Sequence, residues 1–136
     1  VVAYDPFVQS SDVAEMVTLD ELIKRADYIS MHTPLTDDTK GMVNADFLAG
    51  CKDGVYIVNT GRGKCVDEKA MVAALESGKV ATYATDVWPS DPPPADCPIL
   101  KAPNVVMTPH IGASSGANLL RISDIIVEKI TAFLAE

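Results

Sequence analysis

The chain has 136 residues, of which 48% are hydrophobic, and its formal net charge is −8 at pH 7. This length suits one domain with a real core, and the acidity without any basic stripe excludes a nucleic-acid-binding surface. No apolar stretch approaches the roughly 20 residues that span a bilayer and no signal peptide is visible, so we expect a soluble cytoplasmic protein without a membrane partner.

The first third of the chain predicts two short strands, a helix and a third strand. Residues 1–4 form an apolar run that stops at a proline, and residues 15–17 are a weaker second strand. Residues 19–25 form a short helix, because Thr18 and Glu21 have the spacing of a capping box. Residues 27–31 then form the next strand.

The middle of the chain continues the alternation. A small helix is expected over 45–48 and a strand over 55–58. Asp67 is placed to cap a helix over 69–75, which Gly78 closes.

The last third predicts two strands, a loop and a long helix. The strands cover 81–85 and 105–107, and between them the proline-rich stretch 89–103 is expected to be loop. Ser114 or Ser115 caps a last helix, whose apolar stripe is core or subunit interface: Leu119, Ile122, Ile126, Ile130 and Phe133. Strands that alternate with helices predict an α/β domain with a mostly parallel sheet.

Three of the apolar runs end in short polar motifs. These are Asn59-Thr60-Gly61-Arg62-Gly63, Asp86-Val87-Trp88-Pro89-Ser90-Asp91 and Thr108-Pro109-His110-Ile111-Gly112. Short apolar runs bounded by Gly and Pro are typical of buried strands, and the loops at the carboxyl ends of parallel strands open into one crevice. We therefore expect Arg62, a carboxylate and His110 to share one site, suited to an enzyme that binds a carboxylate and moves a proton.

Cysteine and histidine are too few and too scattered for a metal site. Cys51, Cys65 and Cys97 are odd in number and share no C-x-x-C spacing, and the two histidines lie on different segments. The sequence therefore predicts no metal ligands and no paired disulfides, as is usual in a reducing cytoplasm.

The end of the first strand raises the question of a dinucleotide. Dinucleotide-binding folds place an acid at such a position, about 20 residues after a G-x-G-x-x-G turn, to bind the adenosine ribose. Asp5 occupies the position, yet only four residues precede it, and the motif Gly61-Arg62-Gly63 lacks the third glycine. Either the phosphate-binding strand and turn lie upstream in a longer protein, which we favour, or Asp5 is an ordinary turn residue.

Taken in order, these motifs resemble the D-isomer-specific 2-hydroxyacid dehydrogenases, and the Asp-Val-Trp-Pro-Ser-Asp-Pro run is most similar to their phosphoglycerate dehydrogenase branch. The likeness covers nearly the whole chain. It rests on the motifs above together with Tyr4-Asp5-Pro6, Leu19-Asp20-Glu21-Leu22, His32-Thr33-Pro34-Leu35-Thr36 and Val66-Asp67-Glu68.

The resemblance implies a Rossmann-type NAD-binding domain that lacks its first strand and glycine turn. Residues 1–113 would be the later part of that domain, and residues 114–136 a helix that returns toward a substrate domain. The implied activity is hydride transfer between NAD(H) and a small 2-hydroxy or 2-keto acid, with 3-phosphoglycerate one candidate, in a homodimeric full-length protein.

The resemblance also implies roles for individual residues. Arg62 would bind the substrate carboxylate and His110 would exchange the hydroxyl proton, with Asp91 as the acid paired with His110. Because family members carry Glu where this chain has Asp91, we expect a longer contact, or one through water. The residues implied to contact NAD are Asp5, Thr33, Pro34, Thr60, Gly61, Arg62, Asp86, His110, Gly112 and Ala113, with Asp86 meeting the nicotinamide carboxamide.

Other interpretations of the same residues stay open. Arg62 could instead be a solvated cation in a turn, His110 a structural histidine, and Asp91 an ordinary acid in a loop. The chain as a whole has the alternatives of an NAD(H)-sensing module without turnover and of an inactive isolated fragment. A carboxylate at Asp5 favours NAD over NADP, because it repels a 2′-phosphate.

Overall fold

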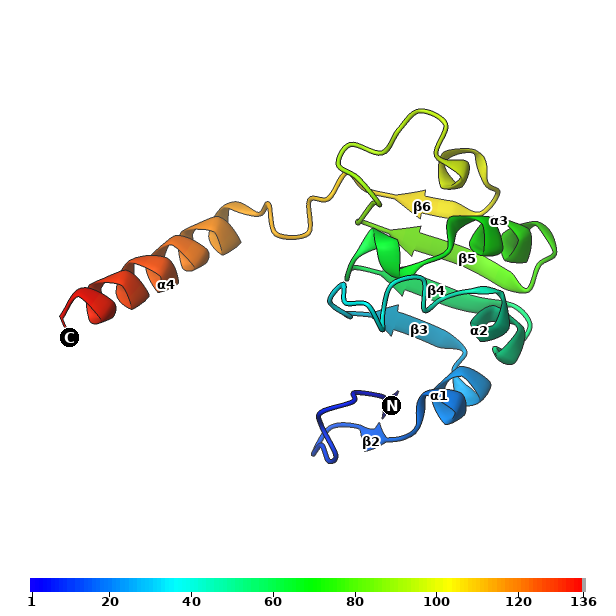
Figure 1. The fold of residues 1–136 in the computed structure, drawn as a ribbon, viewed down its shortest axis with the longest axis horizontal. Coiled ribbons are helices and arrows are strands. Elements are labelled where there is room, and N and C mark those ends of the chain that lie inside the picture. Colours follow the sequence, from blue (N-terminus) through cyan, green and yellow to red (C-terminus); the bar gives the residue numbers. More distant parts are fainter. Residues whose placement is uncertain (136) are drawn as a thin grey trace.

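The structure is a computed structural model that describes residues 1–135. Its strands form two parallel sheets (Figure 1). The small sheet pairs β1 (Val2–Ala3) with β2 (Glu15–Met16). The larger sheet has the order β3-β4-β5-β6, and its strands are Tyr28–Met31, Val55–Asn59, Val80–Thr85 and Val105–Met107. The predicted parallel α/β fold is confirmed.

Helices connect these strands. The α-helices are α1 (Leu19–Arg25), α2 (Ala45–Gly50), α3 (Glu68–Glu76) and α4 (Gly116–Leu134). Two short 3₁₀ turns, η1 (Gly63–Cys65) and η2 (Pro98–Lys101), were not among the predicted elements. The expectation that 89–103 is all loop is therefore wrong, because proline with its fixed φ fits the first turn of a helix, where Pro98 stands.

Side-chain caps begin the helices at the predicted places. The Thr18 hydroxyl accepts a hydrogen bond from the Glu21 N–H while the Glu21 carboxylate accepts one from the Thr18 N–H, which completes the capping box of α1. Asp67 caps α3 by accepting from two backbone N–H groups. Of the two candidate serines, Ser115 caps α4.

The core lies on one face of the larger sheet, between the strands and the helices α2 and α3 (Figure 1). In β4 the alternate residues Val55 and Ile57 are each 1% exposed, whereas Tyr56 is 42% exposed. On the open face Tyr56 stacks on Tyr28, with ring centroids 4.9 Å apart. The expectation of buried strands is thus wrong for one face, since the packed helices cover only the other.

The helix α4 extends away from both sheets (Figure 1). It has no buried residue along its 19 residues, and Leu119, Ile126 and Phe133 of the predicted stripe are all at least half exposed. The stripe therefore forms no part of the core within residues 1–135. Its other predicted role, as a subunit interface, stays a prediction.

Candidate active site

The parallel pairing of β4, β5 and β6 brings the three polar motifs to one edge of the sheet. Asn59 of β4 is in register with Thr85 of β5, and Thr85 in turn with Met107 of β6. The first motif begins at Asn59 and the other two directly follow Thr85 and Met107, so Arg62, Asp91 and His110 extend from neighbouring loops at the carboxyl edge. This is the arrangement that the sequence predicts for a shared crevice.

Two glycines let these loops touch backbone to backbone. A Cβ built on Gly63 would lie 2.2 Å from the Trp88 carbonyl carbon, which no side chain allows. A Cβ built on Gly61 would lie 2.7 Å from the Thr33 carbonyl oxygen. The loop after β4 is thus pressed against the loops after β3 and β5, and a side chain at either glycine would separate them.

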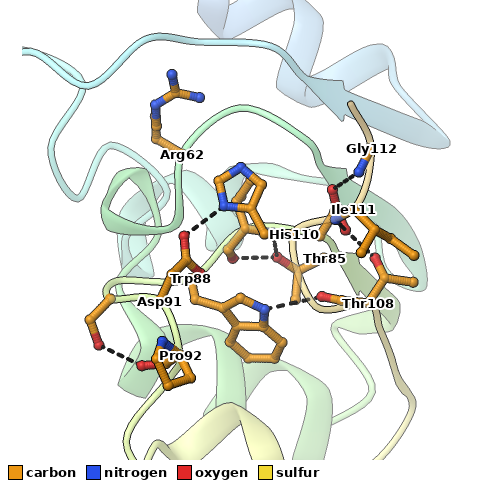
Figure 2. Close-up of polar contacts among 12 residues, drawn as sticks. Arg62, Thr85, Trp88, Asp91, Pro92, Thr108, His110, Ile111 and Gly112 are labelled. Carbon is orange, nitrogen blue, oxygen red and sulfur yellow. Dashed lines mark hydrogen bonds and ion pairs between the residues drawn. The ribbon is translucent and has the colours of Figure 1, made fainter. Parts of the chain in front are cut away.

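A single carboxylate holds the turn that carries His110. Asp86 accepts hydrogen bonds from the Thr108 hydroxyl (2.5 Å), the Ile111 N–H (2.9 Å) and the Gly112 N–H (2.8 Å) (Figure 2). Partial burial raises the pKa of Asp86, but the hydrogen bonds from these donors outweigh it and lower the pKa overall.

The same turn gives His110 an uncommon backbone. Its φ of 56° lies in the left-handed region, which a non-glycine residue enters only when its surroundings hold it there. The hydrogen bonds that Asp86 accepts from the next two N–H groups supply that hold. Backbone strain of this kind is common at functional sites.

His110 and Asp91 form a direct pair. Nδ1 of His110 lies 2.6 Å from Oδ2 of Asp91, and both side chains are about half exposed, at 46% and 50% (Figure 2). The expectation of a longer or water-bridged contact is therefore wrong. The path of the loop compensates for the shorter acid, because the Trp88 indole N–H donates to the Thr108 carbonyl at 3.1 Å and draws the two loops together.

The protonation of the pair follows from its chemistry. An ionised carboxylate only accepts hydrogen bonds, so Nδ1 of His110 must carry the proton in this contact. The other ring nitrogen, Nε2, is then left to accept or donate a proton toward a bound molecule.

Arg62 is exposed next to this pair and does not bond to it (Figure 2). Among the described residues its guanidinium makes one side-chain hydrogen bond, from an Nη to the Gly61 carbonyl at 2.8 Å. The remaining N–H donors face solvent, so the fork is available for a carboxylate.

The residues implied to contact the nucleotide keep some unused hydrogen-bonding capacity. Oδ1 of Asp5 accepts from the N–H groups of Phe7 and Val8, while Oδ2 has no partner among residues 1–135. Asp5 also lines an open pocket of about 500 Å³. The hydroxyl of Thr33 is buried without a hydrogen-bond partner in the described part of the chain.

Other implied contacts are already occupied within the protein. Thr60 hydrogen bonds to the Met31 carbonyl and to Nδ1 of His32, both in the neighbouring strand and loop. The Gly112 N–H donates to Asp86. Asp86 itself accepts three hydrogen bonds, which leaves about one acceptor position for a carboxamide.

The sequence analysis did not identify Asn59 as a buried residue that contacts these loops. Asn59 is 0% exposed, although it belongs to a polar motif. Its position carried a signal, because the alternation of β4 puts it on the same buried face as Val55 and Ile57. The hydrogen bond from Trp88 to the loop after β6 had no comparable signal in the sequence.

Residues 1–135 contain no group of three or more His, Cys, Asp or Glu side chains placed to hold a metal ion. No helix within these residues combines the length and the apolar composition that a membrane span needs.

Comparison with protein families places this arrangement among known domains. Residues 1–112 match the family model described as the D-isomer specific 2-hydroxyacid dehydrogenase, NAD binding domain. A hydroxypyruvate reductase of Thermotoga maritima is 44% identical over an alignment of 133 residues, with 96% of this chain and 44% of the relative covered. A D-3-phosphoglycerate dehydrogenase of Archaeoglobus fulgidus is 42% identical over 134 residues, with 96% and 25% covered.

A solved structure has the same fold. The NAD-dependent formate dehydrogenase of Staphylococcus aureus in complex with NAD superposes with a TM-score of 0.86 at 37% identity, over 96% of this chain and 40% of that one. The chain thus spans between a quarter and a little under half the length of these proteins.

The close approach at Gly63 makes a direct prediction. Gly63→Ala should lower the free energy of unfolding by about 1–3 kcal/mol, because the new methyl overlaps the Trp88 backbone. Urea denaturation measures it, with Gly116→Ala as the matched control, since a Cβ there meets nothing within 4 Å. Equal stability of the two variants would show that the loops are not in contact.

The lowered pKa of Asp86 makes a second prediction. Its carboxylate stabilises the folded chain above the ordinary Asp value of about 3.9, and this contribution is lost as the pH falls through the lower folded pKa. Asp86→Asn should therefore be less stable than wild type near neutral pH, with the gap closing as the pH falls below the ordinary Asp value of about 3.9.

Urea denaturation at a series of pH values tests this, with the exposed Asp124→Asn on α4 as control. A gap for Asp86→Asn that does not change with pH would contradict the role of the ionised carboxylate.

Proposed function

The chain belongs to the D-isomer-specific 2-hydroxyacid dehydrogenases, through their NAD-binding domain, and from that premise we propose the chemistry of its site. The protein interconverts a small 2-hydroxy acid and its 2-keto acid with NAD(H). The observation that carries this proposal is the direct contact between His110 and Asp91, beside the Arg62 guanidinium, which has no ion-pair partner among residues 1–135.

NAD(H), when bound, accepts or supplies the hydride, and the protein supplies position, charge and a proton. Asp5 keeps a free carboxylate oxygen for the ribose hydroxyls, and the unpartnered Thr33 hydroxyl borders the adenosine half. Asp86 has acceptor capacity left for a carboxamide. These unused groups fit the cofactor, and the charge of Asp5 favours NAD over NADP.

Arg62 binds the substrate carboxylate. Its guanidinium offers a permanently charged, bidentate fork, which matches the two carboxylate oxygens. Bound in this way, a 2-keto acid has its carbonyl oxygen beside the arginine as well. Charge that develops on that oxygen during reduction is therefore stabilised by the same cation.

His110 moves the proton. In the direction of reduction its Nε2–H gives a proton to the carbonyl oxygen as the hydride arrives at the carbon, and in the reverse direction Nε2 takes the hydroxyl proton. Asp91 holds the ring by accepting from Nδ1 and stabilises the imidazolium. The reaction balances as keto acid, NADH and one proton giving hydroxy acid and NAD⁺.

The proposal extends to the substrate, the oligomeric state and the cellular compartment of the full-length protein. The substrate is a small 2-hydroxy or 2-keto acid, with 3-phosphoglycerate a candidate because of the Asp-Val-Trp-Pro-Ser-Asp-Pro run. The full-length protein is a homodimer, as the resemblance implies. It works in the cytoplasm, in keeping with three cysteines that are all unpaired and buried.

The proposal is tested with the full-length protein by following NADH absorbance over a panel of 2-keto acids, including hydroxypyruvate and glyoxylate, and NAD reduction with 3-phosphoglycerate. Arg62→Ala should lower kcat/KM by about 10²–10³-fold, as loss of a charge-stabilising donor typically does. Lys64→Ala, which removes an exposed cation two residues away, should leave it unchanged. Binding of NADH without oxidation by any acid would favour a sensing module and refute the enzyme.

The pair itself makes a separate prediction. Asp91→Asn should lower kcat at least about tenfold, since general acid–base catalysis contributes about 10²–10⁴-fold and the imidazolium loses its partner. Asp91→Glu should keep activity, because it restores the carboxylate. The control is Asp96→Asn, an exposed acid of the same loop. If Asp91→Asn is as active as Asp96→Asn, Asp91 is a plain loop acid.

A further inference from the structure

The two buried polar residues of the described chain stand side by side. Asn59 is 0% and Thr85 4% exposed, and they are register partners at the carboxyl ends of β4 and β5. Burying a polar side chain costs free energy unless it is hydrogen-bonded. Both residues therefore need partners, and both find them in the loop that follows their own strand.

The amide of Asn59 holds the backbone on either side of Arg62. Oδ1 accepts from the Gly61 N–H at 3.0 Å, and Nδ2 donates to the Arg62 carbonyl at 3.1 Å. The two bonds hold the dipeptide Gly61-Arg62 at its first N–H and at its last carbonyl. They therefore fix the direction in which the backbone presents the arginine side chain.

Only one of the two orientations of the Asn59 amide satisfies these hydrogen bonds. A flipped amide would set its oxygen against the Arg62 carbonyl and its NH₂ against the Gly61 N–H, so neither hydrogen bond would form. A third bond runs from Nδ2 to the hydroxyl of Tyr83 at 3.3 Å. Burial raises the pKa of Tyr83, which keeps its phenol neutral.

An apolar residue would suit the strand alone. Val55 and Ile57 share the buried face of β4 with Asn59, and a leucine there would need no partner. It would leave the buried Gly61 N–H without a partner and would leave the Arg62 carbonyl only its hydrogen bond from the Cys65 N–H. The amide is thus explained by the loop that it holds, and not by the sheet.

We propose that Asn59 is a positioning residue, whose amide sets the approach of Arg62 to the substrate carboxylate. The inference rests on the proposed function, because it assigns Asn59 an effect on turnover only through Arg62. Misplacement of a binding group by about 1 Å costs about 10²-fold in rate. Loss of these two hydrogen bonds should therefore weaken binding of the acid more than binding of the nucleotide.

The test uses the full-length protein and the 2-keto acid on which it is most active. Asn59→Asp keeps an oxygen for the Gly61 N–H but sets a second oxygen against the Arg62 carbonyl. It should lower kcat/KM about 10- to 100-fold, mainly through KM, with the Kd for NADH within about twofold of wild type. Tyr83→Phe removes only the third bond of the same amide and should stay within about threefold.

A double-mutant cycle separates positioning from general damage. If Asn59 acts through Arg62, then Asn59→Asp should cause less than about a threefold further loss in an Arg62→Lys background. Thermal unfolding checks that each variant is folded, and Asn59→Ser, which shortens the side chain, carries the same test if Asn59→Asp does not fold.

The outcomes distinguish this inference from the proposed function. A wild-type protein that oxidises NADH with no acid refutes the function before any variant is compared. An active wild type in which the Asn59 variants match Tyr83→Phe overturns the inference alone. Losses that multiply independently with Arg62→Lys, or a Kd for NADH that rises as much as KM, overturn it as well.

Discussion

The backbone hydrogen bonds that pair β4, β5 and β6 in parallel are the constraint on which the site depends. They set Asn59, Thr85 and Met107 at one level, so that three loops leave the sheet at the same edge. No contact among Arg62, Asp91 and His110 is needed to bring their loops together. The backbone pairing of the strands does this without any side chain. A shift of the register by one residue would turn Asn59 out of the core.

Above that edge, the loops are also fixed by one another. Asp86 in the loop after β5 holds the turn that contains His110, and Trp88 bonds to the carbonyl that precedes this turn. Gly63 allows the loop after β4 to rest on the Trp88 backbone. The geometry of the candidate site is therefore shared among loops that are distant in sequence, and the side chains of His110 and Asp91 lie half exposed at its surface.

Much of this was accessible from the sequence. The capping residues Thr18 and Asp67 were predicted because caps act within three residues, and the edge of the sheet followed from the alternation of strands and helices. The direct contact of Asp91 with His110 was not, since it depends on the path of a long loop. The sequence also does not distinguish two kinds of glycine. Gly63 is needed because the Trp88 backbone leaves no room for a side chain, whereas Gly54 and Gly78 adopt a positive φ. The open face of the sheet was missed because an apolar strand does not show which of its faces a helix covers, and Tyr28 and Tyr56 both lie on the uncovered face.

The isolation of α4 has a thermodynamic consequence. Its 19 residues bury nothing against the sheets, so its helical state rests on its own backbone hydrogen bonds and the Ser115 cap. A single helix of this length is marginal in water and gains order gradually rather than all at once. On warming, we expect residues 116–134 of the chain taken alone to lose helix over a broad range, separately from the cooperative transition of the sheets. We expect their amide protons to exchange with solvent long before those of β4.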